Sequence, residues 1–253
     1  MGNCSVQLLV IGTAMVSFQI MHGIFTEYIA QGILSELMWS AAAIELSIYA
    51  CLAAFELKLR NPQIDQPCTC WPEYYPIALF ISLGRGLTWV AYATLSYPTV
   101  IVFKSSKILV VMASGLFILR KRFKPAQYFA AIFAVLGLYL VSTADFSVEK
   151  DMGTVVDSHM GVAVACLATL LEGTVSNLQE RSLKREHRSL AGMLFYTNGL
   201  GSMILYCTAT INGEMHTFLS EIKRTPIALM WLLATVVLAY GSVFHNHSPN
   251  SLI

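Results

Sequence analysis

Long apolar runs alternate with short polar stretches along the whole chain. Eight of these runs approach the length of about 20 residues that an α-helix needs to cross a bilayer. They lie at 5–24, 37–56, 76–96, 99–119, 126–142, 160–179, 191–211 and 227–244. The pattern predicts an all-α polytopic membrane protein with about eight transmembrane helices, of which the fifth is short.

Prolines mark where several of these runs begin and end. Pro67 lies between the second and third runs, while Pro125 and Pro226 precede the fifth and the eighth. Proline is favoured in the first turn of a helix, because an N–H group there has no partner inside the helix. The pair Tyr97-Pro98 separates the third run from the fourth, so we expect a very tight connection there.

Basic and acidic loops alternate along the chain. Four Lys and Arg residues lie within 120–124 and four more within 181–188, whereas the charged residues of 27–36 and 145–157 are mainly acidic. Lys and Arg near the ends of spans are retained on the cytosolic side of a membrane. We therefore expect the loops that follow even-numbered helices, and both termini, to face the cytosol.

The amino-acid composition excludes two other classes of protein, a soluble domain and a disordered chain. Hydrophobic residues make up 56% of the 253 residues and charged residues only 12%, with a mean hydropathy of +0.61. So few charges could not cover the surface of a soluble domain, and so apolar a chain is not intrinsically disordered. The net charge of +1 gives no support for a nucleic-acid partner.

The sequence lacks the common catalytic and metal-binding patterns. It contains no H-E-x-x-H, no G-x-S-x-G and no Gly-rich phosphate loop after a strand. Cys68 and Cys70 form a C-x-C that lacks the second cysteine pair of a zinc site. We expect neither an enzyme nor a metal or other cofactor, and we expect all six cysteines to be reduced.

Five charged residues fall inside the predicted spans: Glu45, Arg85, Lys104, Lys107 and Glu172. A charge at mid-bilayer costs about 2.5–3.5 kcal/mol on insertion scales, so it needs a partner or a water-filled cavity. Lys104 and Lys107 are three residues apart and share one face of a helix. Either these cations pair with internal carboxylates, as Arg85 would with Glu45, or they bind an anion such as a phosphate.

Aromatic rings accompany these cations. Tyr92 and Tyr97 lie shortly before the two lysines, and Tyr196 lies in the seventh run. A flat ring stacks on a nucleobase with about 1–3 kcal/mol, although most rings in a membrane protein belong to the core or to the interfacial belt. Lys104 also lies near the start of its helix, where the partial positive charge of the helix end favours an anion.

Several short motifs occur in the order found in one transporter family. They are GIFTE at 23–27, YPT at 97–99 with KSSK at 104–107, AD at 144–145, NLQE at 177–180 and FYTN at 195–198. In this combination the chain resembles the UAA branch of the nucleotide-sugar transporters, within the drug/metabolite transporter superfamily. The AD pair resembles the residues found at this place in the subgroup of the family that carries 3′-phosphoadenosine 5′-phosphosulfate (PAPS).

This resemblance implies a fold of ten helices in two inverted five-helix halves. Residues 1–146 would form the first five-helix repeat, residues 147–244 three helices of the second repeat, and residues 245–253 a polar tail. The ninth and tenth helices have no counterpart in the sequence. We therefore expect a C-terminally truncated form of the fold.

The resemblance also implies a function. The chain would transport PAPS, or else a nucleotide sugar such as a UDP-sugar, from the cytosol into the lumen of the Golgi or endoplasmic reticulum. Exchange would be by antiport with a nucleotide monophosphate. The alternative is an inactive truncated form that acts by pairing with a full-length copy. The expected partners are the nucleotide conjugate and the lipid bilayer, and a homo-oligomer is compatible with the sequence.

Nine residues are candidates for substrate binding: Lys104, Lys107, Tyr92, Tyr97, Tyr196, Asn198, Arg85, Gln179 and Glu180. The two lysines would neutralise phosphate groups. The tyrosine and the asparagine of the FYTN motif would contact the nucleotide, and the two remaining tyrosines would shape the cavity. No residue is expected to be catalytic.

Overall fold

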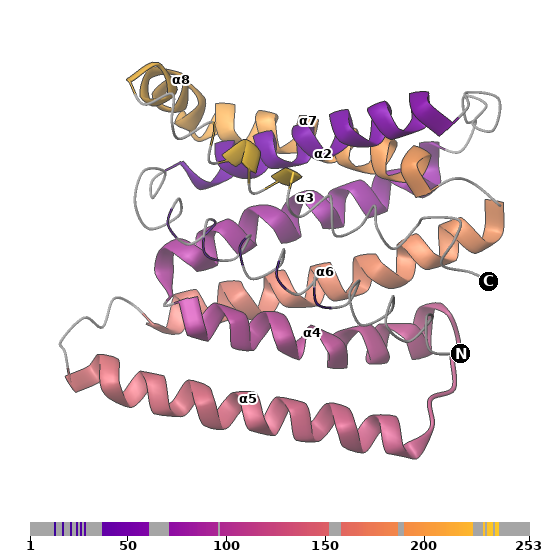
Figure 1. Ribbon diagram of the computed structural model, residues 1–253, viewed down its shortest axis with the longest axis vertical. Coiled ribbons are helices and arrows are strands. Elements are labelled where there is room, and N and C mark those ends of the chain that lie inside the picture. The colour runs from indigo at the N-terminus through magenta and orange to yellow at the C-terminus, as the bar shows by residue number, and fades with distance from the viewer. Residues whose placement is uncertain are drawn as a thin grey trace.

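A computed structural model describes residues 37–60, 71–95, 97–151, 158–186 and 190–224, with a few isolated positions nearer the two ends. Every element within these ranges is an α-helix (Figure 1). The helices are α2 (Met38–Arg60), α3 (Trp71–Thr94), α4 (Tyr97–Ile118), α5 (Pro125–Asp151), α6 (Ser158–Glu186), α7 (Leu190–Ile211) and α8 (Glu214–Arg224). The all-α prediction is confirmed for this part of the chain.

Five of the described helices are long and apolar enough to cross a membrane. The apolar segments are Met38–Leu59, Glu73–Thr94, Thr99–Ile118, Met160–Lys184 and Leu190–Ile211. They correspond to the second, third, fourth, sixth and seventh predicted runs. The fifth run lies in α5, whose apolar segment Pro125–Gly137 is shorter. The first and eighth runs lie mainly outside the described residues, so the total of eight stays a prediction.

Several helices extend beyond the predicted apolar runs. α5 continues to Asp151 and α6 to Glu186, into stretches that the hydropathy pattern assigns to loops. A helix needs only its own backbone hydrogen bonds to continue into water, so its end is not tied to the edge of the apolar run. The expected boundary between the repeats, at residue 146, falls inside α5. The predicted tight connection is confirmed, because α3 ends at Thr94 and α4 begins at Tyr97.

The helices pack as neighbours in an order different from their order in sequence. α2 lies against α7, α3 lies against both α6 and α7, and α4 packs between α6 and α5 (Figure 1). Glycines permit the closest approaches. A Cβ atom on Gly86 would lie 2.4 Å from the Trp39 ring, and one on Gly173 would lie 2.5 Å from Val110. Small residues of this kind let the backbones of membrane helices come together.

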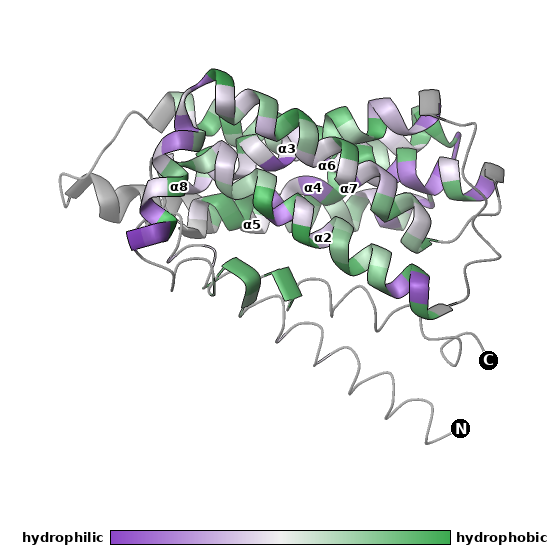
Figure 2. Ribbon diagram, turned by 90° about the horizontal axis from the view of Figure 1, so that it is seen from above, coloured by the Kyte–Doolittle hydropathy of each residue, from purple (hydrophilic) through white to green (hydrophobic). Residues whose placement is uncertain are grey.

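Apolar side chains occur both inside the bundle and on its outer surface. Leu46, Trp89 and Leu205 are buried in the core, whereas Phe129 and Phe133 of α5 are exposed. Figure 2 shows hydrophobic residues over much of the helix lengths and hydrophilic residues mainly toward the ends. An apolar outer surface is what a lipid bilayer covers, so these features agree with a membrane-embedded bundle.

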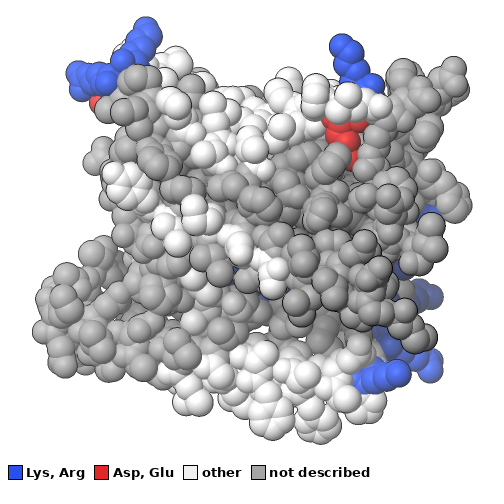
Figure 3. All heavy atoms as spheres, in the orientation of Figure 1, with Lys and Arg blue, Asp and Glu red and all other residues white. Residues whose placement is uncertain are grey.

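The two strongly basic segments meet at one end of the bundle. Lys121, in the connection between α4 and α5, lies 2.6 Å from Glu180 near the end of α6. Lys184 of α6 pairs with the same carboxylate at 2.7 Å. On the face drawn in Figure 3, most visible Lys and Arg side chains lie toward the ends of the helices. The structure thus places both basic segments on one side, as the alternation of loop charges predicts.

The other end of the bundle carries the short helix α8, which the hydropathy pattern did not predict. Eleven residues cannot span a bilayer, and only one face of α8 is apolar, with Phe218 fully buried. Gly213 has a φ of 76° and makes the corner between α7 and α8. Glu214 then accepts hydrogen bonds from the backbone N–H groups of Trp39 (3.1 Å) and Ser40 (3.4 Å) and so caps α2.

Candidate functional site

Charged side chains from four helices meet in the interior of the bundle. Arg85 of α3 forms an ion pair with Glu45 of α2, with 3.2 Å between Nη1 and Oε1. The other oxygen of Glu45 accepts a hydrogen bond of 2.7 Å from Nε1 of Trp89. Glu45 is only 3% exposed, so it is a buried carboxylate with two partners on one neighbouring helix. The pairing of Arg85 with Glu45, one of the two alternatives that the sequence left open, is thus present in the structure.

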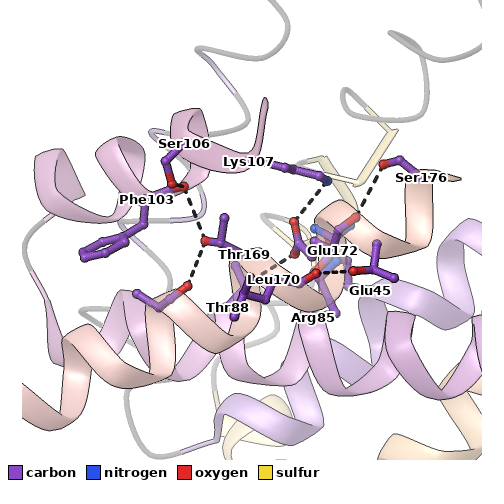
Figure 4. Close-up of polar contacts among 12 residues, drawn as sticks. Glu45, Arg85, Thr88, Phe103, Ser106, Lys107, Thr169, Leu170, Glu172 and Ser176 are labelled. Carbon is purple, nitrogen blue, oxygen red and sulfur yellow. Dashed lines mark hydrogen bonds and ion pairs between the residues drawn. The ribbon is translucent and has the colours of Figure 1, made fainter. Parts of the chain in front are cut away.

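A second ion pair lies beside the first (Figure 4). Nζ of Lys107, on α4, is 3.5 Å from Oε2 of Glu172, on α6. Oε1 of Glu172 accepts a hydrogen bond of 2.9 Å from the hydroxyl of Thr88, on α3. The carboxylate therefore joins three helices, and its partners come from positions that are far apart in the sequence.

The other lysine of the KSSK motif is placed differently. Nζ of Lys104 lies 4.7 Å from the centroid of the Tyr92 ring, a cation–π distance. Lys104 also borders a void of about 10 Å³, enough for roughly one water molecule. Within this central group, three cations face two carboxylates, Glu45 and Glu172. We call these five residues (Glu45, Arg85, Lys104, Lys107 and Glu172) the charge cluster; together they carry a formal charge of +1.

A cavity of about 210 Å³ lies next to the ion pairs. Its lining comes from α2, α3, α4, α6 and α7: Tyr49, Ile81, Arg85, Lys107, Glu172, Val175, Ser176, Gln179, Leu194 and Asn198. Two of these side chains are cations, and four others carry a hydroxyl or an amide. A hollow with this lining can accept an anion and can offer hydrogen bonds to the polar groups of a larger ligand.

Four of the predicted site residues share this cavity. Arg85, Lys107, Gln179 and Asn198 all line it, although they come from four different helices. Lys104 and Tyr92 contact each other beside the smaller void instead. Five of the nine residues selected from the sequence therefore line one of the two hollows, and a sixth, Tyr92, contacts Lys104 beside the smaller one.

The three remaining candidates lie elsewhere or outside the described side chains. Tyr196 stacks on Tyr74, with ring centroids 5.9 Å apart and an angle of 6° between the planes. Glu180 pairs with two lysines at the basic end of the bundle. The side chain of Tyr97 is not among those described. A role in substrate binding stays a prediction for all three residues.

Tyr49 and Ser176 line the cavity and were not selected from the sequence. A signal for both was present in the spacing. Glu45 and Tyr49 are four residues apart on α2, and Glu172, Ser176 and Gln179 recur at intervals of four and three on α6. Such intervals place polar residues on one face of a helix. A search for polar helix faces inside the predicted spans would have found them.

The glycines on either side of Arg85 serve helix packing. A Cβ atom on Gly84 would lie 3.1 Å from Cγ of Glu172, and Gly86 faces the ring of Trp39. Both glycines therefore let neighbouring helices approach closely around the charge cluster. Asn177 of the NLQE motif also joins helices, because its Nδ2 donates to the backbone oxygen of Val111 (2.8 Å) and to the hydroxyl of Ser114 (2.7 Å) on α4.

A charged hollow among helices long enough to span a membrane is the kind of site that membrane transporters use. Comparison of the sequence with family models gives the same class: the UAA transporter family model matches residues 7–245. The chain belongs to the UAA transporter family, whose members are transporters and not enzymes.

Curated relatives carry two kinds of name. The chain is 27% identical over 218 residues to adenosine 3′-phospho 5′-phosphosulfate transporter 2 of Anopheles gambiae, covering 81% of the chain and 55% of the relative. It is 26% identical to the Homo sapiens protein of the same name, covering 81% and 52%. It is 27% identical to UDP-galactose/UDP-glucose transporter 4 of Arabidopsis thaliana, covering 87% and 61%. The chain thus spans about half the length of the curated relatives it matches.

Proposed function

We propose that the protein moves an anionic nucleotide conjugate across a membrane, with PAPS as the first candidate and a UDP-sugar as the second. The observation that carries the proposal is the cavity of about 210 Å³ lined by Arg85 and Lys107 inside the spanning bundle. Cations in the hydrocarbon region are costly unless they serve a partner or a pathway. The cavity wall carries two cations and one carboxylate, which favours an anionic guest.

The names of the relatives support the choice of substrate class. PAPS and the UDP-sugars share a nucleotide and at least two negative charges, and both kinds occur among the relatives. PAPS is placed first because PAPS transporters of several animals are among the matches and because the AD pair after the fifth run resembles that subgroup. Both kinds of substrate carry phosphate groups, and these are the groups that the cations of the cavity would bind.

The size of the cavity indicates which part of the substrate its residues would contact. Ligand sites for drug-sized molecules have volumes of about 300–1,000 Å³, so a hollow of about 210 Å³ holds a phosphate group but not a whole nucleotide conjugate. Lys107 and Arg85 would contact the phosphate, while Asn198 of α7 and Gln179 of α6 would contact the rest of the molecule. Full binding then requires the helices around the cavity to separate.

Transport of this kind follows from alternating access to one central site. The charge cluster lies within the spanning segments, where both aqueous sides can be reached in turn. Antiport with a nucleotide monophosphate, a Golgi or endoplasmic-reticulum membrane, and termini on the cytosolic side complete the proposal. They are supported by the family resemblance and by the two basic segments at one end of the bundle.

The test is uptake into proteoliposomes that contain the purified protein and are preloaded with adenosine or uridine monophosphate. We expect labelled PAPS or UDP-galactose to accumulate, and we expect Lys107→Ala and Lys104→Ala each to lower uptake by at least tenfold. Lys223→Ala, which removes an exposed lysine of α8 far from the cavity, is the matched control. Uptake that persists in both site variants would remove the proposed role of these lysines.

A second candidate function stays the alternative to transport by the chain alone. In it, the chain acts by pairing with a longer protein of the same family. Absence of uptake by the chain alone, together with changed uptake when it is co-reconstituted with a full-length relative, would support this second candidate. Uptake by the chain alone would exclude the need for such a partner.

A further inference from the structure

The two carboxylates of the charge cluster have different surroundings. Glu45 is 3% exposed, does not line the cavity, and is held by Arg85 and Trp89. Glu172 is 17% exposed and forms part of the cavity wall. A ligand entering the cavity therefore meets Glu172 directly, whereas Glu45 stays behind Arg85.

The contact between Lys107 and Glu172 is long for a charged hydrogen bond. Its 3.5 Å exceeds the distance of about 2.7–2.9 Å that N–H to carboxylate bonds usually have. Lys107 is 34% exposed and also lines the cavity. Glu172 is thus held weakly by Lys107 and more firmly by α3, where the hydroxyl of Thr88 donates to its other oxygen at 2.9 Å.

We infer that Glu172 is a built-in counter-ion that the substrate displaces from Lys107. The carboxylate neutralises the ammonium group at 3.5 Å, and Figure 4 shows the two side chains facing each other. A phosphate oxygen of the substrate takes the place of Oε2 on Lys107, while Oε1 stays with Thr88. This inference rests on the proposed function, and it assigns to Glu172 the control of affinity at the same site.

Two consequences follow for binding. An ionised Glu172 competes with the substrate for Lys107 and repels its phosphates, so the pair keeps affinity low enough for release. Removing the charge of Glu172 should tighten the binding of any phosphate ligand. The gain should be larger for a ligand with two phosphates than for a ligand with one, because the removed repulsion grows with the ligand's charge.

The experiment measures binding by the purified full chain in detergent, without transport. The probes are adenosine 3′,5′-bisphosphate and adenosine 5′-monophosphate, and the method is titration calorimetry. We expect Glu172→Gln to lower the dissociation constant for the bisphosphate by on the order of tenfold, the size of about 1.4 kcal/mol of charge interaction. The gain for the monophosphate should be smaller. Glu221→Gln, the same chemical change on α8, is the matched control and should bind as the wild type does.

A double-mutant cycle separates competition from a structural role of Glu172. If Glu172 acts through Lys107, Glu172→Gln should lose most of its effect in a Lys107→Gln background. Glu172→Asp is the second variant in case Glu172→Gln does not fold. It keeps the charge but moves the carboxylate away from Lys107, so it should tighten binding by about two- to threefold, less than Glu172→Gln does.

The outcomes distinguish the inference from the proposed function. If the wild type and all variants fail to bind either adenosine nucleotide, PAPS falls as the first candidate substrate and the inference falls with it. If the wild type binds and Glu172→Gln binds equally or more weakly, the proposed function stands and the inference is wrong. Equal gains from Glu172→Gln with and without Lys107 would likewise overturn the displacement of the counter-ion.

Discussion

Nη1 of Arg85 lies 3.2 Å from Oε1 of Glu45, across the contact between α3 and α2. The carboxylate is 3% exposed, and Trp89, four residues after Arg85 on the same helix, donates to its other oxygen. One side chain of α2 thus holds two side chains of one face of α3. The pair orients Arg85 toward the cavity that it lines.

Removing this carboxylate should destabilise the protein. In Glu45→Ala the charge of Arg85 and the N–H group of Trp89 lose their partner inside the bundle. Loss of one partner from a buried ion pair costs about 3–5 kcal/mol. We expect a lower melting temperature in detergent, measured by intrinsic fluorescence. Glu221→Ala, which removes a pair at the exposed surface of α8, should change stability by less than about 0.5 kcal/mol.

Two glycines offer a direct test of helix packing. A Cβ atom on Gly86 would lie 2.4 Å from the Trp39 ring, whereas one on Gly137 of α5 would meet no atom within 4 Å. We expect Gly86→Ala to destabilise the protein by about 1–3 kcal/mol through overpacking. Gly137→Ala should be neutral or stabilising by up to about 1 kcal/mol, because alanine is the better helix former. Equal melting temperatures for the two variants would contradict the close contact of α2 and α3.

Glu214 should hold α8 against the start of α2. Glu214→Ala removes the acceptor for two backbone N–H groups of α2, whereas Glu214→Gln keeps an oxygen in place. We expect the alanine variant to lose about 0.5–2 kcal/mol of stability and the glutamine variant to lose much less. Limited proteolysis in the connection at Gly213 measures the release of α8. Similar cleavage of all three proteins would show that the cap does not hold the helix.

The same contact should depend on pH in a defined direction. Burial raises the pKa of Glu214 above its usual value of 4.5, although the two backbone donors act in the opposite direction. A raised folded pKa means that the folded state favours the protonated form. The resulting stabilisation is fully present below the usual pKa and is lost as the pH rises through the raised one. The stability of the wild type relative to Glu214→Gln should therefore decrease as the pH rises above the usual pKa of 4.5, measured by thermal unfolding.

The side chain of Asn177 should hold α6 against α4, the helix that carries both lysines of the KSSK motif. Its Nδ2 makes two hydrogen bonds to α4, at 2.8 and 2.7 Å. Hydrogen bonds between membrane helices contribute about 0.6–2 kcal/mol, so Asn177→Leu should lower stability by about 1 kcal/mol. Thr174→Val removes only a bond within α6 and is the matched control. A larger loss in the control than in Asn177→Leu would show that the amide does not hold α4.

The candidate site could be predicted in part from the sequence. Charged residues inside apolar runs are rare, so Arg85, Lys107 and Glu172 could be selected without coordinates. The polar lining residues Tyr49 and Ser176 were missed because serine and tyrosine are common in membrane helices. A single residue of either type in an apolar run therefore does not indicate a site. The helix α8 was missed because a span search requires about 20 apolar residues, and this helix has one apolar face over 11 residues.

The sequence by itself determined the class of the protein and five of the spans, because the cost of placing polar groups in lipid allows only long apolar helices to cross a bilayer. It also determined which residues need an internal partner there. Only the tertiary structure decided that Lys107 pairs with Glu172 and Arg85 with Glu45, and that a cavity lies beside them. Such pairs depend on which helix faces meet, and contacts between residues 40 and 65 positions apart are not encoded in any local pattern.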